Sequence, residues 1–126
     1  MRTTLPTITR TYNEETKKMD VIKGQIEVDI DTSFQAHLKW EEQFGSTMNC
    51  DLTTYTERVQ SWLNDTGKSK ANFLGLLKRL YCYVSSEKLP TFKEFCKLFD
   101  FEIADEILKK IKDVLDEVNK TISKNS

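Results

Sequence analysis

The chain has 126 residues, 38% of them apolar and 31% charged, which suits a single domain with one hydrophobic core. Lys and Arg (19) nearly balance Asp and Glu (20), and the resulting net charge of -1 argues against a general nucleic-acid binder, which needs a basic face. Four Gly and two Pro give few of the turns that an all-β fold needs, and no apolar run approaches the roughly 20 residues of a membrane span.

The N-terminal residues 1–20 are polar and rich in threonine, and they lack the apolar stretch of a secretory signal. Residues 7–12 can form a short strand, because threonine and tyrosine suit strands. From Ile26 to Ile30 apolar and polar residues alternate, which indicates a strand with one buried face. Two arrangements agree with this pattern: a hairpin between residues 7–12 and 21–31, or an unordered arm before a single strand.

From Phe34 onward the apolar residues recur at steps of three and four, which is typical of helices. We expect a first helix that begins behind a capping box of Thr32 and Gln35 and stops at Gly45. A second helix follows the capping residue Asp51 and ends before residues 64–67.

A third helix, capped by Ser69, has the broadest apolar surface of the chain and is expected to lie at the centre. Thr91 and Glu94 form another capping box before a short helix, and a long amphipathic helix follows. The sequence therefore predicts a mainly α fold, a single small helical domain of about five helices with a short N-terminal β-strand or hairpin. The helical domain is expected to span residues 21–122, and residues 123–126 are expected to fray.

The residues that could carry catalysis or bind a metal are few. His37 is the single histidine, and we considered a dyad or a zinc site that it would form with Cys50, Cys82 and Cys96. The spacings match no common zinc pattern, and Cys82 and Cys96 lie in apolar stripes. The triplet Gly67-Lys68-Ser69 lacks the earlier glycine of a phosphate loop, so a turn between helices explains it better. We therefore predict no catalytic residue, cofactor or metal, and expect reduced thiols in a cytosol.

Aromatic residues are the stronger signal, because most of them fall between residues 40 and 101. Tyr83 and Phe101 stand beside the apolar stripes rather than on them, which indicates that some aromatic surface is exposed. An exposed aromatic patch on a domain of balanced charge favours protein binding.

Several short segments occur in a recognisable order between residues 26 and 126. They are Asp31-Thr32-Ser33-Phe34, Leu38-Lys39-Trp40-Glu41, Phe44-Gly45, Asp51-Leu52, Tyr55, Glu57-Arg58-Val59, Leu80-Tyr81-Cys82-Tyr83, Thr91-Phe92-Lys93-Glu94-Phe95, Leu98-Phe99-Asp100 and Lys124-Asn125. In this order and spacing the chain resembles the tail assembly chaperones of long-tailed phages (siphoviruses) of Gram-positive bacteria.

The resemblance implies a protein that works in the host bacterial cytoplasm and is absent from the mature virion. Such proteins bind the tape-measure protein, keep it soluble and recruit tail-tube subunits, and this chain looks like the short product of a frameshifted pair. The resemblance brings no catalytic residue, cofactor, nucleic acid, membrane or small-molecule substrate with it, and self-association stays open. The alternative is a generic helical adaptor, or a phage-encoded inhibitor of a host protein, which predicts the same composition.

We expect the tape-measure protein to contact the last helix and the aromatic cluster before it, because a helical partner needs a groove for its apolar anchors. The expected partner-binding residues are Tyr83, Phe92, Phe95, Phe99, Phe101, Ile107, Ile111, Val114 and Val118. The alternative is that the stripe in the last helix only closes the core.

Overall fold

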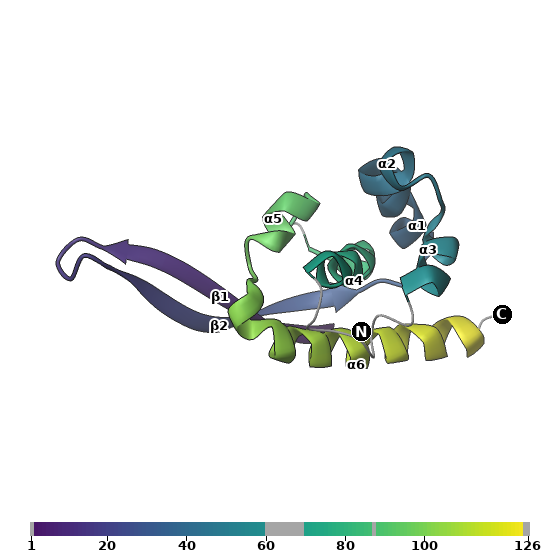
Figure 1. Ribbon diagram of the computed structural model, residues 1–126. Coiled ribbons are helices and arrows are strands. Elements are labelled where there is room, and N and C mark those ends of the chain that lie inside the picture. The colour runs from purple at the N-terminus through teal and green to yellow at the C-terminus, as the bar shows by residue number, and fades with distance from the viewer. Residues whose placement is uncertain (1, 60–69, 87, 125–126) are drawn as a thin grey trace.

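A long antiparallel hairpin begins the chain in the computed structural model, which describes residues 2–59, 70–86 and 88–124 (Figure 1). Its strands are β1 (Arg2–Asn13) and β2 (Lys18–Ile30), and they pair along their whole length. The hairpin alternative is therefore confirmed, and both strands are longer than the sequence predicts.

The turn of the hairpin is held by a side chain. The Asn13 carboxamide oxygen accepts hydrogen bonds from the backbone N–H groups of Glu15 (3.0 Å) and Thr16 (3.3 Å). Lys17 completes the reversal with a φ of 56°, in the left-handed region. Asparagine is common in such turns because its side chain can replace a backbone hydrogen-bond acceptor.

A third strand, β3 (Val84–Ser85), lies beside the end of β2 and pairs with Asp29 and Ile30. The strand order is β1-β2-β3. The pairing continues for one more bond, because the Asp31 N–H donates to the Tyr83 carbonyl at 2.8 Å.

The first helical segment is longer than predicted. It consists of α1 (Phe34–Trp40), a π-helical turn (Glu41–Gly45) and α2 (Ser46–Met48) in one run. Gly45 therefore does not stop the helix. Asn49 ends it instead, with a φ of 53°, because asparagine tolerates the left-handed conformation that closes many helices.

The cap of α1 differs from the prediction by one residue. The Ser33 hydroxyl accepts the hydrogen bond from the Gln35 N–H at 3.3 Å, so Ser33 and not Thr32 is the capping residue. Either residue could have acted, since serine and threonine have similar capping chemistry.

Two other predicted caps are confirmed. Asp51 accepts a hydrogen bond from the backbone N–H three residues on, at 2.7 Å, and begins α3 (Leu52–Val59). Thr91 accepts the equivalent bond at 3.2 Å and begins α5 (Phe92–Cys96). The end predicted for the second helix, at residues 64–67, lies outside the described residues, as does the predicted cap Ser69.

The central helix is α4 (Lys70–Tyr83), which contacts α1, α3, α5 and α6. Leu76, Leu77 and Leu80 of this helix are buried. A 3-10 turn (Phe101–Ile103) then leads into α6 (Ala104–Lys124). The wide apolar surface of the segment thus predicted its central position correctly.

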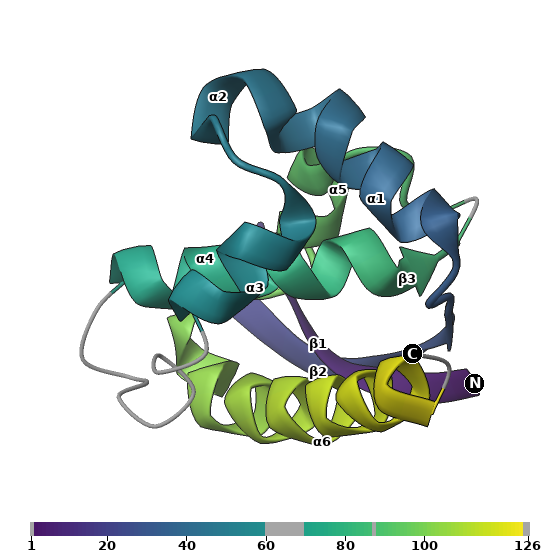
Figure 2. The same cartoon turned by 90° about the vertical axis from the view of Figure 1, so that its right-hand side faces the viewer.

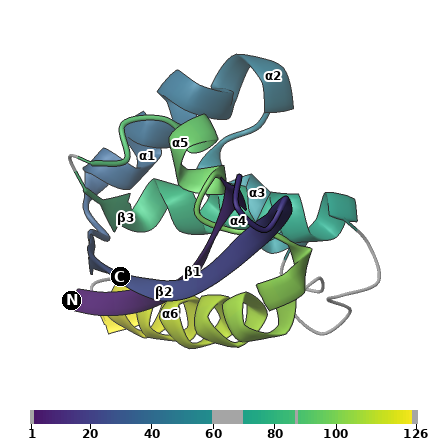
Figure 3. The same ribbon diagram turned by 90° about the vertical axis from the view of Figure 1, so that its left-hand side faces the viewer.

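The helices cover only one part of the hairpin. Its base, residues 2–8 and 23–30, lies between α4 and α6 (Figures 2 and 3). Leu5, Ile8, Val28 and Ile30 of the base are buried in the core. The arm, residues 9–22, extends beyond the helices (Figure 1).

The prediction of a mainly α, all-helical fold is wrong. The protein is an α/β mixture, in which a three-stranded antiparallel sheet packs with the helices. The arm explains the error, because both of its faces are exposed and its sequence lacks the alternation of a half-buried strand. The boundary proposed between residues 20 and 21 falls inside β2.

Candidate protein-interaction surfaces

Most of the residues predicted to bind a partner lie in the core. The buried ones are Tyr83, Phe95, Phe99, Ile107, Ile111, Val114 and Val118. Phe92 is half-buried, and Phe101 is 42% exposed. In this conformation the stripe of α6 therefore closes the core, which is the alternative that the sequence left open.

The aromatic cluster before α6 is a packing unit. Phe95 packs against Tyr81 and Phe99 with ring centroids 5.3 Å and 5.0 Å apart, and Phe44 meets Phe92 edge-on at 5.2 Å. Such edge and tilted contacts are the favoured geometries of aromatic pairs. The cluster joins α4 and α5 to the π-helical turn.

The polar atoms of two large aromatic residues are satisfied inside this core. The Trp40 indole N–H donates to the Cys50 carbonyl at 2.7 Å, and the Tyr55 hydroxyl donates to the Gly75 carbonyl at 3.0 Å. Burial raises the pKa of Tyr55 to about 12, which keeps its hydroxyl protonated as a donor.

A buried arginine ties the central helix to α6. The Arg79 guanidinium is fully buried and donates to the Asn119 side-chain oxygen at 3.1 Å. It also hydrogen-bonds the Tyr83 side chain. Burial lowers the pKa of Arg79, but arginine stays charged in proteins, so the contact is a charged one.

The arm carries apolar side chains that face solvent. They are Tyr12, Met19, Val21 and Ile22, and Ile22 is 59% exposed. Tyr12 lies opposite Met19 in the hairpin, and Val21 lies two residues along on the same face, while Ile22 points to the other face beside Thr9. A two-stranded ribbon with exposed apolar residues on both faces is a candidate contact surface.

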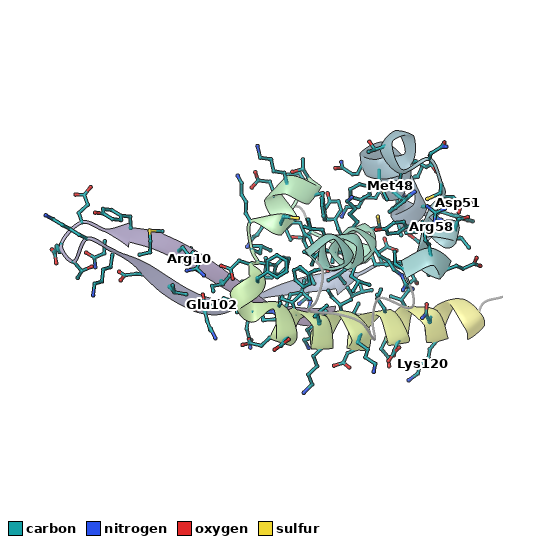
Figure 4. The ribbon with its side chains drawn as sticks, in the orientation of Figure 1. Arg10, Met48, Asp51, Arg58, Glu102 and Lys120 are labelled. Atoms are coloured by element: carbon teal, nitrogen blue, oxygen red, sulfur yellow. The ribbon has the colours of Figure 1, made fainter. Side chains whose placement is uncertain are left out.

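A charged contact fixes the arm to the body where the two meet. The Arg10 guanidinium donates to Asp100 at 2.8 Å and also to Glu102, and Figure 4 shows Arg10 directed from the hairpin toward Glu102. The hydrogen bond to Asp100 is the main cause that raises the pKa of Arg10. A backbone hydrogen bond also joins the hairpin to the body at this point, because the Ile8 N–H donates to the Leu98 carbonyl at 2.8 Å.

A second exposed apolar surface lies on α1, and we call it the α1 ridge. Phe34 is 84% exposed and Leu38, one turn later on the same face, is 52% exposed. Leu38 also lines a hollow of about 380 Å³, together with Val84, Leu89 and Pro90. The sequence did not predict this surface, because helical spacing alone does not show which face of a short helix is covered.

Lys39 fixes the position of the α1 ridge. Its ammonium donates to the Val84 carbonyl at 2.6 Å and lies 3.7 Å from the centroid of the Tyr81 ring. Burial lowers the pKa of Lys39. The contact joins α1 to β3 and α4, so the ridge is held on the body rather than on a loose segment.

The residues that the sequence offers for chemistry are His37 and three cysteines. The three cysteines are free, and burial raises the pKa of Cys82 to about 12. Within the described residues no group of three His, Cys, Asp or Glu side chains could hold a metal ion. The phosphate-loop triplet at 67–69 lies outside those residues.

The comparisons with known proteins give no relative. No family model, no curated protein and no solved structure matches the chain. Among the helices of the described part of the chain, none combines the length and the apolar character needed to cross a membrane.

Proposed function

We propose that the protein is a tail assembly chaperone of a long-tailed phage, the short product of a frameshifted pair. In this role it binds the tape-measure protein, keeps it soluble and helps to recruit tail-tube subunits. It acts in the host bacterial cytoplasm and is left out of the mature virion. The resemblance over residues 26–126 supports the proposal, and the exposed apolar side chains of the body supply a surface for it.

The observation that carries the proposal is the α1 ridge. Phe34 and Leu38 are large apolar residues with most of their surface in water, and they stand one turn apart on a helix that Lys39 fixes to the body. Single exposed apolar residues are normal on a protein surface, but an adjacent pair beside a hollow is typical of a binding site.

The ridge suits a helical partner. An amphipathic helix presents apolar anchors at steps of three and four residues, and the ridge with the neighbouring hollow offers a raised edge and a recess for them. The hollow is also lined by Asp31, Lys39 and Glu42, so charges of both signs surround the apolar contact. Tape-measure proteins are long and helical in the family that the chain resembles, which agrees with such a partner.

Co-expression tests this function. The tape-measure protein of the phage that encodes this chain is expected to be insoluble alone and soluble when the chain is present. The double variant Phe34→Ser/Leu38→Ser is expected to lose this effect while keeping its far-UV circular dichroism. Leu74→Ser is the matched control, because Leu74 is exposed to a similar degree but lies on α4.

Two results would overturn parts of this proposal. If the tape-measure protein stays insoluble with both the short and the frameshifted products, the chaperone function fails and the adaptor or inhibitor function replaces it. If the double variant solubilises as well as the control does, the α1 ridge is not the binding surface.

A further inference from the structure

One edge of the sheet is open over most of its length. In an antiparallel sheet the N–H and C=O groups of alternate residues point to opposite edges. The Ile8 N–H points away from β2 to Leu98, and the Asp31 N–H points to the β3 side. Since Ile8 lies opposite Lys23, both bonds show that the odd-numbered residues of β2 point outward, away from β1.

The outward groups before β3 have no strand beside them. β3 pairs only with Asp29 and Ile30, so the outward groups of residues 19, 21, 23, 25 and 27 face no further strand within the described part of the chain. A groove of about 790 Å³ runs beside this edge and is lined by consecutive residues of β2 from Gln25 to Asp29, with Ser85, Ser86 and Lys88 at its end.

The opposite edge of the hairpin is protected. Pro6 occupies an outward position on β1 and has no N–H to offer. The N–H of Ile8 is already bonded to Leu98, Arg10 is held by Asp100 and Glu102, and α6 contacts β1. Natural proteins protect edge strands in these ways. The edge of β2 has no proline from residue 19 to residue 27, and Lys23 of this segment forms an ion pair with Glu106 of α6 at 3.6 Å.

We propose that the open edge of β2 pairs with the same edge of a second copy of this chain, with Ile22 opposite Ile22 at the two-fold axis. The two hairpins then form one antiparallel four-stranded ribbon. This dimer does not depend on the proposed role in tail assembly, because it uses the open edge of β2 and not the α1 ridge.

The length of the open edge limits the register. Moving the centre toward the body drives the arm of the second copy into β3. Residue 19 of that copy lies opposite Asp29 when the centre is Gly24, and residue 21 does so when the centre is Gln25. Centring on Ile22 brings only the tip of the turn of the second copy, at Glu15, opposite Asp29, beside the last residue of β3, where the groove lies.

Charge excludes the neighbouring registers. A centre at Lys23 places two lysines directly opposite each other, which is unfavourable across strands. A centre at Val21 places Glu15 of the second copy opposite Glu27, which is also a pair of like charges. The centre at Ile22 places no like charges opposite each other between residues 17 and 27, and it brings Lys17 of the second copy opposite Glu27.

Pairing with a second copy would stabilise the arm. A two-stranded hairpin is marginally stable alone in water, and three or more strands with an apolar face are needed for independent stability. The paired arms would bring Tyr12, Met19 and Val21 of both copies to one face and the two Ile22 side chains together on the other. This accounts for exposed apolar residues on a segment that the helices do not cover.

A matched pair of variants tests the dimer. Ile22→Lys places two lysines at the axis, whereas Thr9→Lys changes the residue directly opposite Ile22 on β1, one strand further from the axis. By sedimentation equilibrium the native chain and Thr9→Lys are expected to be dimers at tens of micromolar, and Ile22→Lys a monomer with unchanged circular dichroism. A monomeric native chain, or a dimer that survives Ile22→Lys, overturns the proposal.

Crosslinking tests the register. Ile22 residues that face each other at the axis form a pair without hydrogen bonds between them, with Cα atoms close enough for a disulfide. Under mild oxidation Ile22→Cys is expected to give a covalent dimer that the native chain and Thr9→Cys do not give. Crosslinking of Thr9→Cys as fast as Ile22→Cys would overturn this register.

Gln25→Pro is an independent check on the edge. Gln25 lies opposite Pro6 and points outward, so the substitution removes a hydrogen-bond donor from the open edge and none from the ladder to β1. We expect a folded monomer. A folded variant that still forms the native dimer overturns the pairing through β2.

Discussion

The base and the arm of the hairpin belong to the same two strands, yet they have different surroundings. In the base, Leu5 and Val28 are buried among helices, whereas in the arm the apolar Met19 and Ile22 face water. The backbone pairing runs through both parts without a break. Strand pairing is thus set locally by the turn and the register, whereas burial is set by what the rest of the chain places beside the strands.

The largest expected difference between the base and the arm is the stability lost when an apolar side chain is truncated to alanine. Leu5→Ala should lower the free energy of unfolding by about 2–5 kcal/mol, because it leaves a cavity in the core. Ile22→Ala should lower it by less than about 0.5 kcal/mol, because Ile22 is exposed. Urea denaturation at a concentration where the chain is monomeric measures both, and equal losses would show that the arm is packed as tightly as the base.

A smaller difference is expected between two capping side chains. Thr91→Ala removes the cap of α5 in the body and should cost about 1 kcal/mol. Asn13→Ala removes the equivalent bonds in the turn of the arm and should cost about 0.5 kcal/mol or less, since the turn lies at the end of an exposed ribbon. Thermal unfolding of the two variants compares them, and a larger loss for Asn13→Ala would contradict the account.

Removing the ion pairs at the junction between base and arm should change local amide exchange more than the overall stability. Arg10→Ala breaks the contacts to Asp100 and Glu102, which are exposed, so the midpoint of unfolding should change little. The N–H of Ile8, which bonds Leu98 across the same junction, should exchange faster with solvent. If exchange at Ile8 is unchanged, the ion pairs do not hold the arm to the body.

Low pH is expected to destabilise the helical body, because two of its aspartates have a lowered pKa in the folded state. Hydrogen bonds from Ser33 lower the pKa of Asp31, and the backbone hydrogen bond from Thr54 lowers the pKa of Asp51. A lowered pKa in the folded state means that the stabilisation is present above the ordinary aspartate pKa of about 4 and is lost as the pH falls below it. Asp51→Asn keeps a capping side chain without the titration, so its loss of stability between pH 5 and pH 2 should be shallower. An identical pH profile would contradict the assignment.

The sequence predicted the elements whose pattern follows from burial on one face or from local capping hydrogen bonds. The alternation from Ile26 to Ile30, the caps Asp51 and Thr91, and the buried leucines of α4 all have this basis. The sequence predicted the arm only as one of two alternatives, because a ribbon exposed on both faces needs no alternation. The run of threonine, valine and isoleucine around the turn at Asn13 was its available signal, since β-branched residues suit strands.

The expected contact surface was harder to predict. The sequence assigned partner binding to the most apolar face of α6, but in the structure Ile107, Ile111 and Val118 close the core over α4. Helical spacing shows that a face is apolar, and it does not show whether another element of the same chain covers that face. Exposure of Phe34, Leu38 and Ile22 depends on tertiary packing, which the sequence pattern does not contain.

Amide hydrogen exchange at two protein concentrations tests most directly whether the exposed arm is an intermolecular surface. The N–H groups of Val21 and Lys23 point to the open edge, whereas that of Ile22 points to β1. Raising the concentration through the dimerisation range should slow exchange at Val21 and Lys23 and leave exchange at Ile22, whose N–H points to β1, unchanged. Exchange at Val21 and Lys23 that is fast and independent of concentration would contradict the account.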